Sequence, residues 1–346
     1  MSGLLRTAVF VLAGLAALYG AGWFYLAGRF SEAVGTFLDA QRAQGLDIAR
    51  AGMAKGGFPL RLEARLAAPS VRFAAAGKKW VWTPARAVFS AAPWALDRVT
   101  LDLAGGHALA AADAADARRW MARADELALE TTLRGAVASG FVLVGRGIAA
   151  ANSSAADEDF AVARLNGRWR RAEVPPVDHL GESQSFEIAA GGVRIPARAR
   201  LPLGPEIARF KIAGRVLGEL LSLNPGMGPG ALGSWRDGGG TVELAGLDAR
   251  YGALVLAGEG TVALDGELQP IAALTARIEG FSETIDALRE RGAMPKRDAA
   301  TAKLILAALA TRAADGRLRL AVPVTLQDGT LFAGPVAILR VPPIPW

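Results

Sequence analysis

The residues best suited to chemistry are few and lie far apart in the chain. There is no cysteine, and the two histidines are His107 and His179. A metal site would therefore rest on carboxylates, because zinc takes three or four ligands. Neither an HExxH nor a GxSxG motif occurs, and no Asp or Glu pair is marked by its spacing. We expect no catalytic residue, metal site or cofactor, and we expect each histidine to lie at the surface or in a loop.

One motif imitates a dinucleotide site. The apolar run Phe141–Val144 precedes Gly145–Ala150, which matches GxGxxA. A dinucleotide site needs a helix to open there, so that its N-terminal N–H groups meet the pyrophosphate. Asn152, two serines and an acidic run follow instead. This context favours a strand that ends in a glycine turn.

Net charge and hydropathy argue against two classes of protein, those that bind nucleic acid and those that cross a membrane several times. The formal net charge is +6 and the isoelectric point is about 10. Because the arginines are scattered through strand-like segments and form no basic arm, we expect no nucleic-acid partner. Hydrophobic residues make up 52% of the chain. This share is too low for several membrane spans, so the excess must have a local source.

That source is the N-terminal segment Thr7–Ala27, which carries no charge. It is about as long as the ~20 residues that cross a hydrocarbon core. Trp23, Phe24 and Tyr25 stand where an interfacial aromatic belt lies, and Arg29 can extend to the headgroups. We predict a membrane anchor with these four residues as its belt. A cleaved signal peptide remains the alternative, because small residues precede the aromatic triplet.

Orientation follows from the charges that flank this segment. Arg6 and the amino terminus stand on the short side, and Glu32 and Asp39 follow on the other. The positive-inside rule then keeps the N-terminus in the cytoplasm and exports the rest. We expect residues 1–29 to form the anchor and residues 30–346 to form one exported β-rich domain.

The exported part alternates apolar and polar residues, as half-buried strands require. One apolar and one polar face favour an antiparallel sheet. Asp265-Gly266 and Asp328-Gly329 are typical of hairpin turns, and we read Gly258–Gly260 as a third turn. The alternating segments are residues 60–66, 99–103, 193–201, 210–216, 254–264 and 318–326.

Helices and loops are expected between the strands. Ser31 is a candidate N-cap for a short amphipathic helix that ends at Gly45. Two further helices are predicted from Ser282 to Gly292 and from Asp298 to Ala314. The polar segment Ala151–Asp159 and the Gly- and Pro-rich segment Asn224–Gly240 are predicted loops.

Several short sequence segments resemble those of a known family. They are Gly57–Leu62, Ala92-Pro93-Trp94, Gly238–Leu244, Leu264–Pro270 and Asp328–Pro335. Together with the anchor, they resemble an uncharacterised Gram-negative envelope family, the domain of unknown function numbered twenty-one twenty-five, which is similar at a distance to AsmA-type proteins. The resemblance implies an inner-membrane helix and a periplasmic, mainly β domain. Its large curved antiparallel sheet would form a groove or half-barrel with a few helices.

The resemblance also implies a function. It suggests a non-enzymatic protein, single-pass in the inner membrane with its bulk in the periplasm, that binds or passes phospholipid along an apolar groove in envelope maintenance. The residues that line such a groove are not identifiable from sequence, because an ordinary core needs the same alternation. Two alternatives stay open. One is an envelope scaffold that binds a partner protein and no lipid, and the other is a hydrolase that uses scattered carboxylates.

Overall fold

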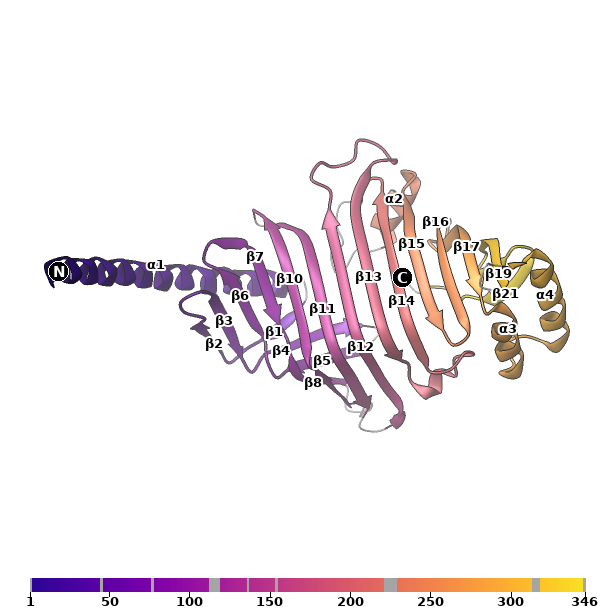
Figure 1. Ribbon diagram of the computed structural model, residues 1–346, viewed down its shortest axis with the longest axis horizontal. Coiled ribbons are helices and arrows are strands. Elements are labelled where there is room, and N and C mark those ends of the chain that lie inside the picture. The colour runs from indigo at the N-terminus through magenta and orange to yellow at the C-terminus, as the bar shows by residue number, and fades with distance from the viewer. Residues whose placement is uncertain are drawn as a thin grey trace. The chain divides into compact units, whose positions relative to one another are not determined.

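A computed structural model of the chain describes residues 2–43, 46–75, 78–111, 119–135, 137–152, 155–220, 229–312 and 318–344. It is mainly β, with a large open antiparallel sheet and a long apolar helix at the N-terminus, as predicted (Figure 1). The chain divides into two compact units, Met1–Ala138 with Leu143–Ala156, and Ser139–Val142 with Asp157–Trp346. Every strand pair in the described residues is antiparallel, as one-sided apolar strands require.

Helix α1 runs without a break over Ser2–Ala43. The prediction of a separate helix capped by Ser31 is wrong, because Ser31 lies inside α1 and is buried. The reason is the spacing of its buried residues, which continues at helical period across that position from Trp23 to Leu38. Before Trp23 most side chains are exposed, and this is the helix that is long and apolar enough to cross a membrane. The predicted helix end at Gly45 lies outside the described residues.

The first unit holds two strand ladders, and α1 contacts β1, β2 and β3. Its core joins buried side chains of α1 to Ile48, Leu62, Ala64 and Phe89. One ladder pairs β2–β3–β6–β7–β10 and the other β1–β4–β5–β8–β9–β11. The strands are β1 (Asp47–Ala49), β2 (Gly52–Gly56), β3 (Leu62–Ala67), β4 (Ser70–Ala75), β5 (Lys78–Pro84), β6 (Val88–Ala92), β7 (Ala95–Asp102), β8 (Gly105–Ala111), β9 (Arg119–Ala124), β10 (Glu126–Arg134) and β11 (Val137–Asn152).

The second unit is one ladder whose strands follow chain order, β12–β13–β14–β15–β16–β17–β19–β20–β21, with β18 also on β19. Three α-helices are described with it. The elements are β12 (Ala155–Arg171), β13 (Glu182–Arg194), the 3₁₀ turn Ala197–Ala199, β14 (Glu206–Leu217), α2 (Pro229–Asp237), β15 (Thr241–Tyr251), β16 (Leu254–Leu264), β17 (Pro270–Glu279), α3 (Phe281–Glu290), α4 (Lys296–Leu309), β18 (Thr311–Arg312), β19 (Leu318–Gln327), β20 (Thr330–Ala333) and β21 (Val336–Arg340).

Two predicted helices and two predicted turns are confirmed. Helices α3 and α4 begin within two residues of their predicted starts. The predicted end of the second helix at Ala314 is wrong, because α4 ends at Leu309 and strand β18 follows at Thr311–Arg312. Asp265 closes the β16–β17 turn, where its side chain accepts hydrogen bonds from the backbone of Glu267 and Gln269. Asp328-Gly329 joins β19 to β20. By contrast, Gly258–Gly260 stays inside β16, because both glycines pair with β15 and with β17.

Three other predictions are corrected. The predicted strand 193–201 stops at Arg194, because Pro196 and Pro202 have no N–H for a ladder. The predicted loop Ala151–Asp159 is largely strand, with residues 153–154 outside the described part; buried Glu158 forms an ion pair with Arg198. The predicted loop Asn224–Gly240 contains α2, with residues 224–228 outside the described part.

The second unit has a core where α3 and α4 meet the sheet, and Leu320 of β19 lies at its centre with no exposed surface. We predict that Leu320→Ala lowers the free energy of unfolding by about 2–5 kcal/mol, because it removes apolar contacts and leaves a cavity. Denaturant unfolding of the detergent-solubilised full chain, followed by tryptophan fluorescence, measures this. Leu318→Ala, at a position that is 41% exposed, is the control, and an equal loss in both variants would contradict the assignment.

Candidate functional site

The four residues of the predicted membrane belt lie in two different environments. Trp23 is buried in the core of the first unit, and its indole N–H donates to the carbonyl of Arg61 at 3.0 Å. Phe24 and Tyr25 are exposed. Arg29 is exposed and forms a 3.1 Å ion pair with Glu32 on the next turn of α1. Trp23 therefore serves the fold, while a belt role for Phe24, Tyr25 and Arg29 stays a prediction.

The two histidines also differ. His179 is exposed, as expected, but His107 is buried in β8, so the prediction of a surface or loop position is wrong for it. Its ring stacks on Trp82 with 5.9 Å between centroids. Neither ring nitrogen forms a hydrogen bond of good geometry with the described residues. Burial lowers the pKa of His107, since the charged imidazole loses hydration.

The GxGxxA motif forms no dinucleotide site in the structure. Gly145–Ala150 lies inside β11, which continues to Asn152, so no helix opens there. Gly147 has a positive φ of 56°, and a Cβ on it would stand 2.1 Å from a carboxylate oxygen of Asp125. This glycine therefore accommodates a close approach between two parts of the first unit.

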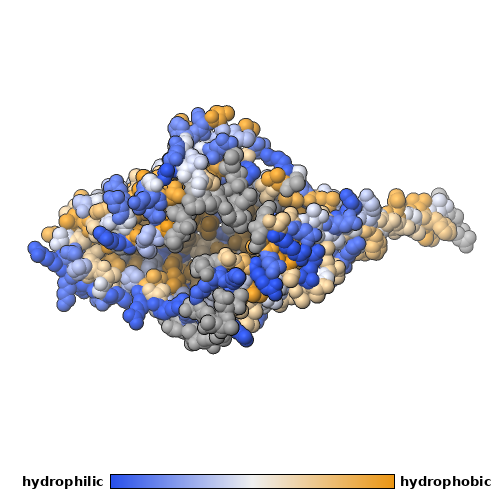
Figure 2. Space-filling model, turned by 180° about the vertical axis from the view of Figure 1, so that it is seen from behind, coloured by the Kyte–Doolittle hydropathy of each residue, from blue (hydrophilic) through white to orange (hydrophobic). Residues whose placement is uncertain are grey.

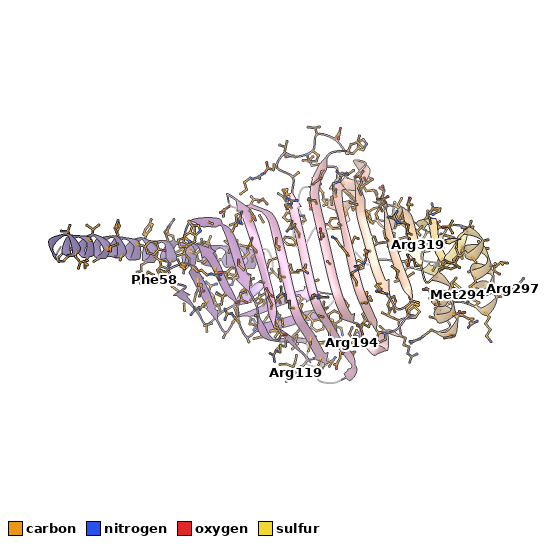
Figure 3. All side chains as sticks on the ribbon, in the orientation of Figure 1. Phe58, Arg119, Arg194, Met294, Arg297 and Arg319 are labelled. Atoms are coloured by element: carbon orange, nitrogen blue, oxygen red, sulfur yellow. The ribbon has the colours of Figure 1, made fainter. Side chains whose placement is uncertain are left out.

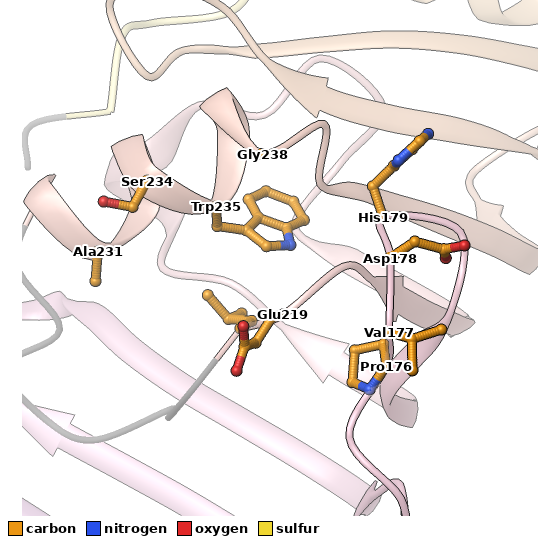
Figure 4. Close-up of a pocket in the computed structure, with 10 residues that line it drawn as sticks. Pro176, Val177, Asp178, His179, Glu219, Ala231, Ser234, Trp235 and Gly238 are labelled. Atoms are coloured by element: carbon orange, nitrogen blue, oxygen red, sulfur yellow. The ribbon is translucent and has the colours of Figure 1, made fainter.

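A pocket of about 500 Å³ lies beside α2 in the second unit (Figure 4). His179 and two carboxylates, Asp178 and Glu219, are among its lining residues. Asp178 already accepts hydrogen bonds from the backbone of Leu180 and Gly181, so its carboxylate holds the loop. Within the described residues, no group of three or more His, Asp or Glu could hold a metal ion. The pocket thus presents a few polar groups, and the described residues around it include no metal-binding cluster.

Trp235 forms one wall of this pocket and fixes α2 to the sheet. Its indole N–H donates to the carbonyl of Leu217 at 2.8 Å. The ring covers Gly240, where a Cβ would stand 2.3 Å from ring atoms. His179 lies in the same way against Gly239. Gly240 is therefore required by the close approach of the indole ring, and Gly239 also has a positive φ of 81°, which favours glycine.

The two faces of the second unit's sheet differ sharply. On the polar face, cross-strand ion pairs join Arg209 to Asp248, Lys211 to Glu187 and Arg319 to Glu279. Arg215 adds a fourth pair with Glu243 at 2.5 Å. Each exposed pair contributes little to stability. Together these charged side chains make this face suited to contact with solvent.

On the opposite face, apolar side chains continue from strand to strand. Ile188 pairs in register with Ile212, and Ile212 pairs with Leu247. We call this surface the apolar face and define it by the central residues Phe186, Ile188, Phe210, Ile212, Leu247 and Leu256. None of the six is buried, and Ile188 is 43% exposed. Seen from behind, the unit carries hydrophobic residues along its middle and hydrophilic residues towards its borders (Figure 2).

Among the described residues of the second unit, buried side chains cover the apolar face at two ends. At one end α3 and α4 lie over β19 and its neighbours and bury Leu320 and Val322. At another, Trp169 donates to the buried side chain of Gln184, and Trp235 contacts the end of β14. Between these ends, no other helix or strand of the unit's described residues contributes a buried cluster over the face. Six sizeable apolar side chains thus remain partly open.

These observations define a class of protein before any comparison. It has one N-terminal helix that is apolar enough to cross a membrane, and a mainly β body with an incompletely covered apolar face. The chain belongs to the bacterial family described as "Uncharacterized protein conserved in bacteria (DUF2125)", which matches residues 23–342. No curated protein and no solved structure matches the chain. The predicted family is therefore confirmed.

Burial of His107 predicts a pH dependence. Its pKa is lowered in the folded state from the ordinary 6.5. Between the two pKa values the unfolded chain binds more protons, so stability is complete above the ordinary value and falls as pH drops below it. Unfolding of the detergent-solubilised chain should become easier from about pH 8 to about pH 5. His107→Phe should lose less stability over this range, and an equal loss in both proteins would refute the role of His107.

The contact between Gly240 and Trp235 predicts a local packing defect. Gly240→Ala should lower the free energy of unfolding by about 1–3 kcal/mol, because the added methyl group overlaps the indole ring. Gly246→Ala is the matched control, since a Cβ there meets nothing within 4 Å. Denaturant titration with fluorescence detection compares the two. Equal free energies of unfolding for the two variants would contradict the prediction, because α2 would then move away from the methyl group without loss of stability.

Proposed function

We propose that this protein binds phospholipid, with acyl chains lying on the apolar face of the second unit. In this proposal it is a non-enzymatic protein of the inner membrane. The α1 helix spans that membrane once and the rest lies in the periplasm, where the protein serves envelope maintenance. The observation that carries the proposal is the set of central apolar side chains that the unit leaves partly open. Large exposed apolar surfaces on folded proteins commonly mark binding sites.

The dimensions of the face suit an acyl chain. The four strands that carry the residues of this face, β13–β16, at a spacing of about 4.8 Å give roughly 14 Å across the face. Half of a hydrocarbon core of ~30 Å, which one acyl chain spans, is about 15 Å. Aliphatic and aromatic side chains such as Ile212 and Phe210 offer no hydrogen-bonding group. They therefore favour a hydrocarbon over a polar ligand.

A membrane anchor adds support for lipid as the occupant. The α1 segment before Trp23 is exposed and apolar and is long enough to cross a bilayer, which supports a membrane environment for it. A body tethered there meets lipid at a far higher local concentration than any soluble apolar molecule. Passing lipid along the face, rather than storing it, is the finer form of the proposal. It follows because the ligand contacts are non-directional and leave a chain free to slide.

Adjacent residues on β14 provide a direct test, since they point to opposite faces. We would place a photo-crosslinking amino acid at Ile212, on the apolar face, or at Lys211, on the polar face, in the full chain. After irradiation of intact membranes, mass spectrometry of the purified protein detects lipid adducts. We expect several-fold more phospholipid adduct at Ile212. Equal labelling would overturn the proposal, and protein adducts confined to Ile212 would favour the envelope scaffold instead.

A second variant pair checks that lipid occupies the face itself. Ile188 neighbours Ile212 in register and is already 43% exposed, so an arginine there can be accommodated. Ile188→Arg should reduce the lipid adduct at position 212, because a charge beside hydrocarbon must be desolvated. Thr275→Arg, at an exposed position on the polar face, should leave the adduct unchanged.

A further inference from the structure

The turn between β2 and β3 lies along α1 beside its apolar segment. Phe58 contacts three aromatic rings of the helix, those of Tyr19, Trp23 and Phe24, with centroid distances of 5.3–6.4 Å. Figure 3 labels Phe58 at this position next to the helix. The turn, Gly57–Arg61, is called the hairpin tip below. It is fixed to the part of α1 that enters the predicted membrane span.

Polar backbone groups of the hairpin tip are paired with side chains of α1. The hydroxyl of Tyr19 donates to the carbonyl of Pro59 at 2.5 Å, and the indole of Trp23 donates to that of Arg61. The N–H of Arg61 donates to the carbonyl of Gly57, and a proline has no N–H. Paired backbone groups are what a hydrocarbon environment demands, because no water is present to satisfy them.

The side chains at the tip nevertheless point into open space. Phe58 is 56% exposed and Leu60 is 63% exposed, whereas Leu62, two residues later, is fully buried. Phe24 of α1, which stacks with Phe58, is 67% exposed. The tip and the helix therefore form one continuous apolar surface.

A second turn presents an aromatic residue at the same edge of the sheet. Strand β6 pairs with β3 so that Ala91 lies opposite Leu62. The β6–β7 turn consequently lies beside the hairpin tip, and its Trp94 is 71% exposed. Tryptophan is enriched at membrane–water interfaces, where its ring is apolar and its N–H remains hydrated.

The position of the tip along α1 gives its depth. The uncharged segment ends at Ala27, and Tyr19, which binds Pro59, precedes that end by eight residues. At 1.5 Å per residue this is about 12 Å. If the whole uncharged segment lies in the membrane, the hairpin tip therefore lies at the level of the acyl chains next to the headgroups.

Cations lie where headgroups would be expected. The ammonium of Lys55 stands 3.6 Å from the position of a Cβ on Gly28, one turn past the tip. Lys55 and Arg61 are exposed, and neither has a carboxylate partner among the described residues. Arg29 follows on the helix. Long cationic side chains in this position can reach phosphate groups while their stems stay in apolar surroundings.

We propose that the hairpin tip is a second membrane-contact element, inserted into the lipid interface of the leaflet where α1 leaves the bilayer. Phe58 and Leu60 enter the acyl-chain region, Trp94 lies at the interface, and Lys55 and Arg61 contact phosphates. The proposal rests on α1 crossing the membrane, as the proposed function does. It does not depend on lipid binding by the second unit.

The chain has no cysteine, so single-cysteine labelling needs no background removal. Full-length Leu60→Cys and Ala54→Cys variants, each carrying the fluorophore NBD, would be reconstituted into vesicles of phosphatidylethanolamine and phosphatidylglycerol. Ala54 is an exposed residue of the same hairpin farther from the tip. We expect nitroxide-bearing lipid to quench the label at Leu60 several-fold more than at Ala54. Aqueous dithionite should reduce the Leu60 label several-fold more slowly.

Three other results would overturn the proposal. Equal access of dithionite to both labels, in protein that floats with the vesicles, would place the tip in water. Protection of Leu60 without quenching by nitroxide lipid would identify a protein contact, such as a second copy. Failure of the protein to float with vesicles would refute the anchor itself. The adduct ratio between Ile212 and Lys211 depends on the second unit alone and so tests the lipid face separately.

Discussion

The constraint on which the fold depends is that the part of the sheet in each unit has an apolar face, and apolar surface must be covered. In the first unit, α1 covers it: Trp23, Phe30 and Leu38 belong to one buried cluster with Leu62 and Phe89 of the strands. In the second unit, α3 and α4 do the same over β19. Where helices cover the sheet, side chains such as Leu62 and Leu320 lose all exposure. Over the middle of the second unit, the part of the chain that the structure describes forms no such layer, and the apolar side chains there stay partly open.

Much of the fold is predictable because strand periodicity is local. The alternation around Phe210–Val216 and Leu318–Leu326 predicts β14 and β19. The two Asp-Gly pairs predict the turns that follow β16 and β19. Predictions failed where distant contacts decide. Glu158 lies in a strand because Arg198 neutralises it, and α2 forms within a glycine-rich segment because Trp235 anchors it to Leu217. Neither contact can be predicted from a local sequence pattern, because the two partners lie far apart in the chain.

The candidate site was predictable only in part, for the same reason. Alternation shows that an apolar face exists, but a covered core and an open face need the same residues. Whether Ile212 is closed over depends on where helices lie, which is a tertiary property. The belt residues show how prediction fails at a single position. Trp23 is of a residue type that is enriched at membrane interfaces, yet it lies in the core. Its distinguishing contact is the carbonyl of Arg61, far along the chain.

The unbroken α1 helix also has a mechanical consequence. No proline or loop separates the apolar segment from the segment that is bound into the first unit, and α1 continues as helix through Gly20 and Gly22 at their junction. With α1 spanning a membrane, as proposed, the span and the first unit would be joined by continuous helix. Any tilt that the bilayer imposes on the helix turns the unit by the same angle, and a thinner membrane brings it closer to the surface. Membrane thickness would then be a variable that sets the orientation of the first unit.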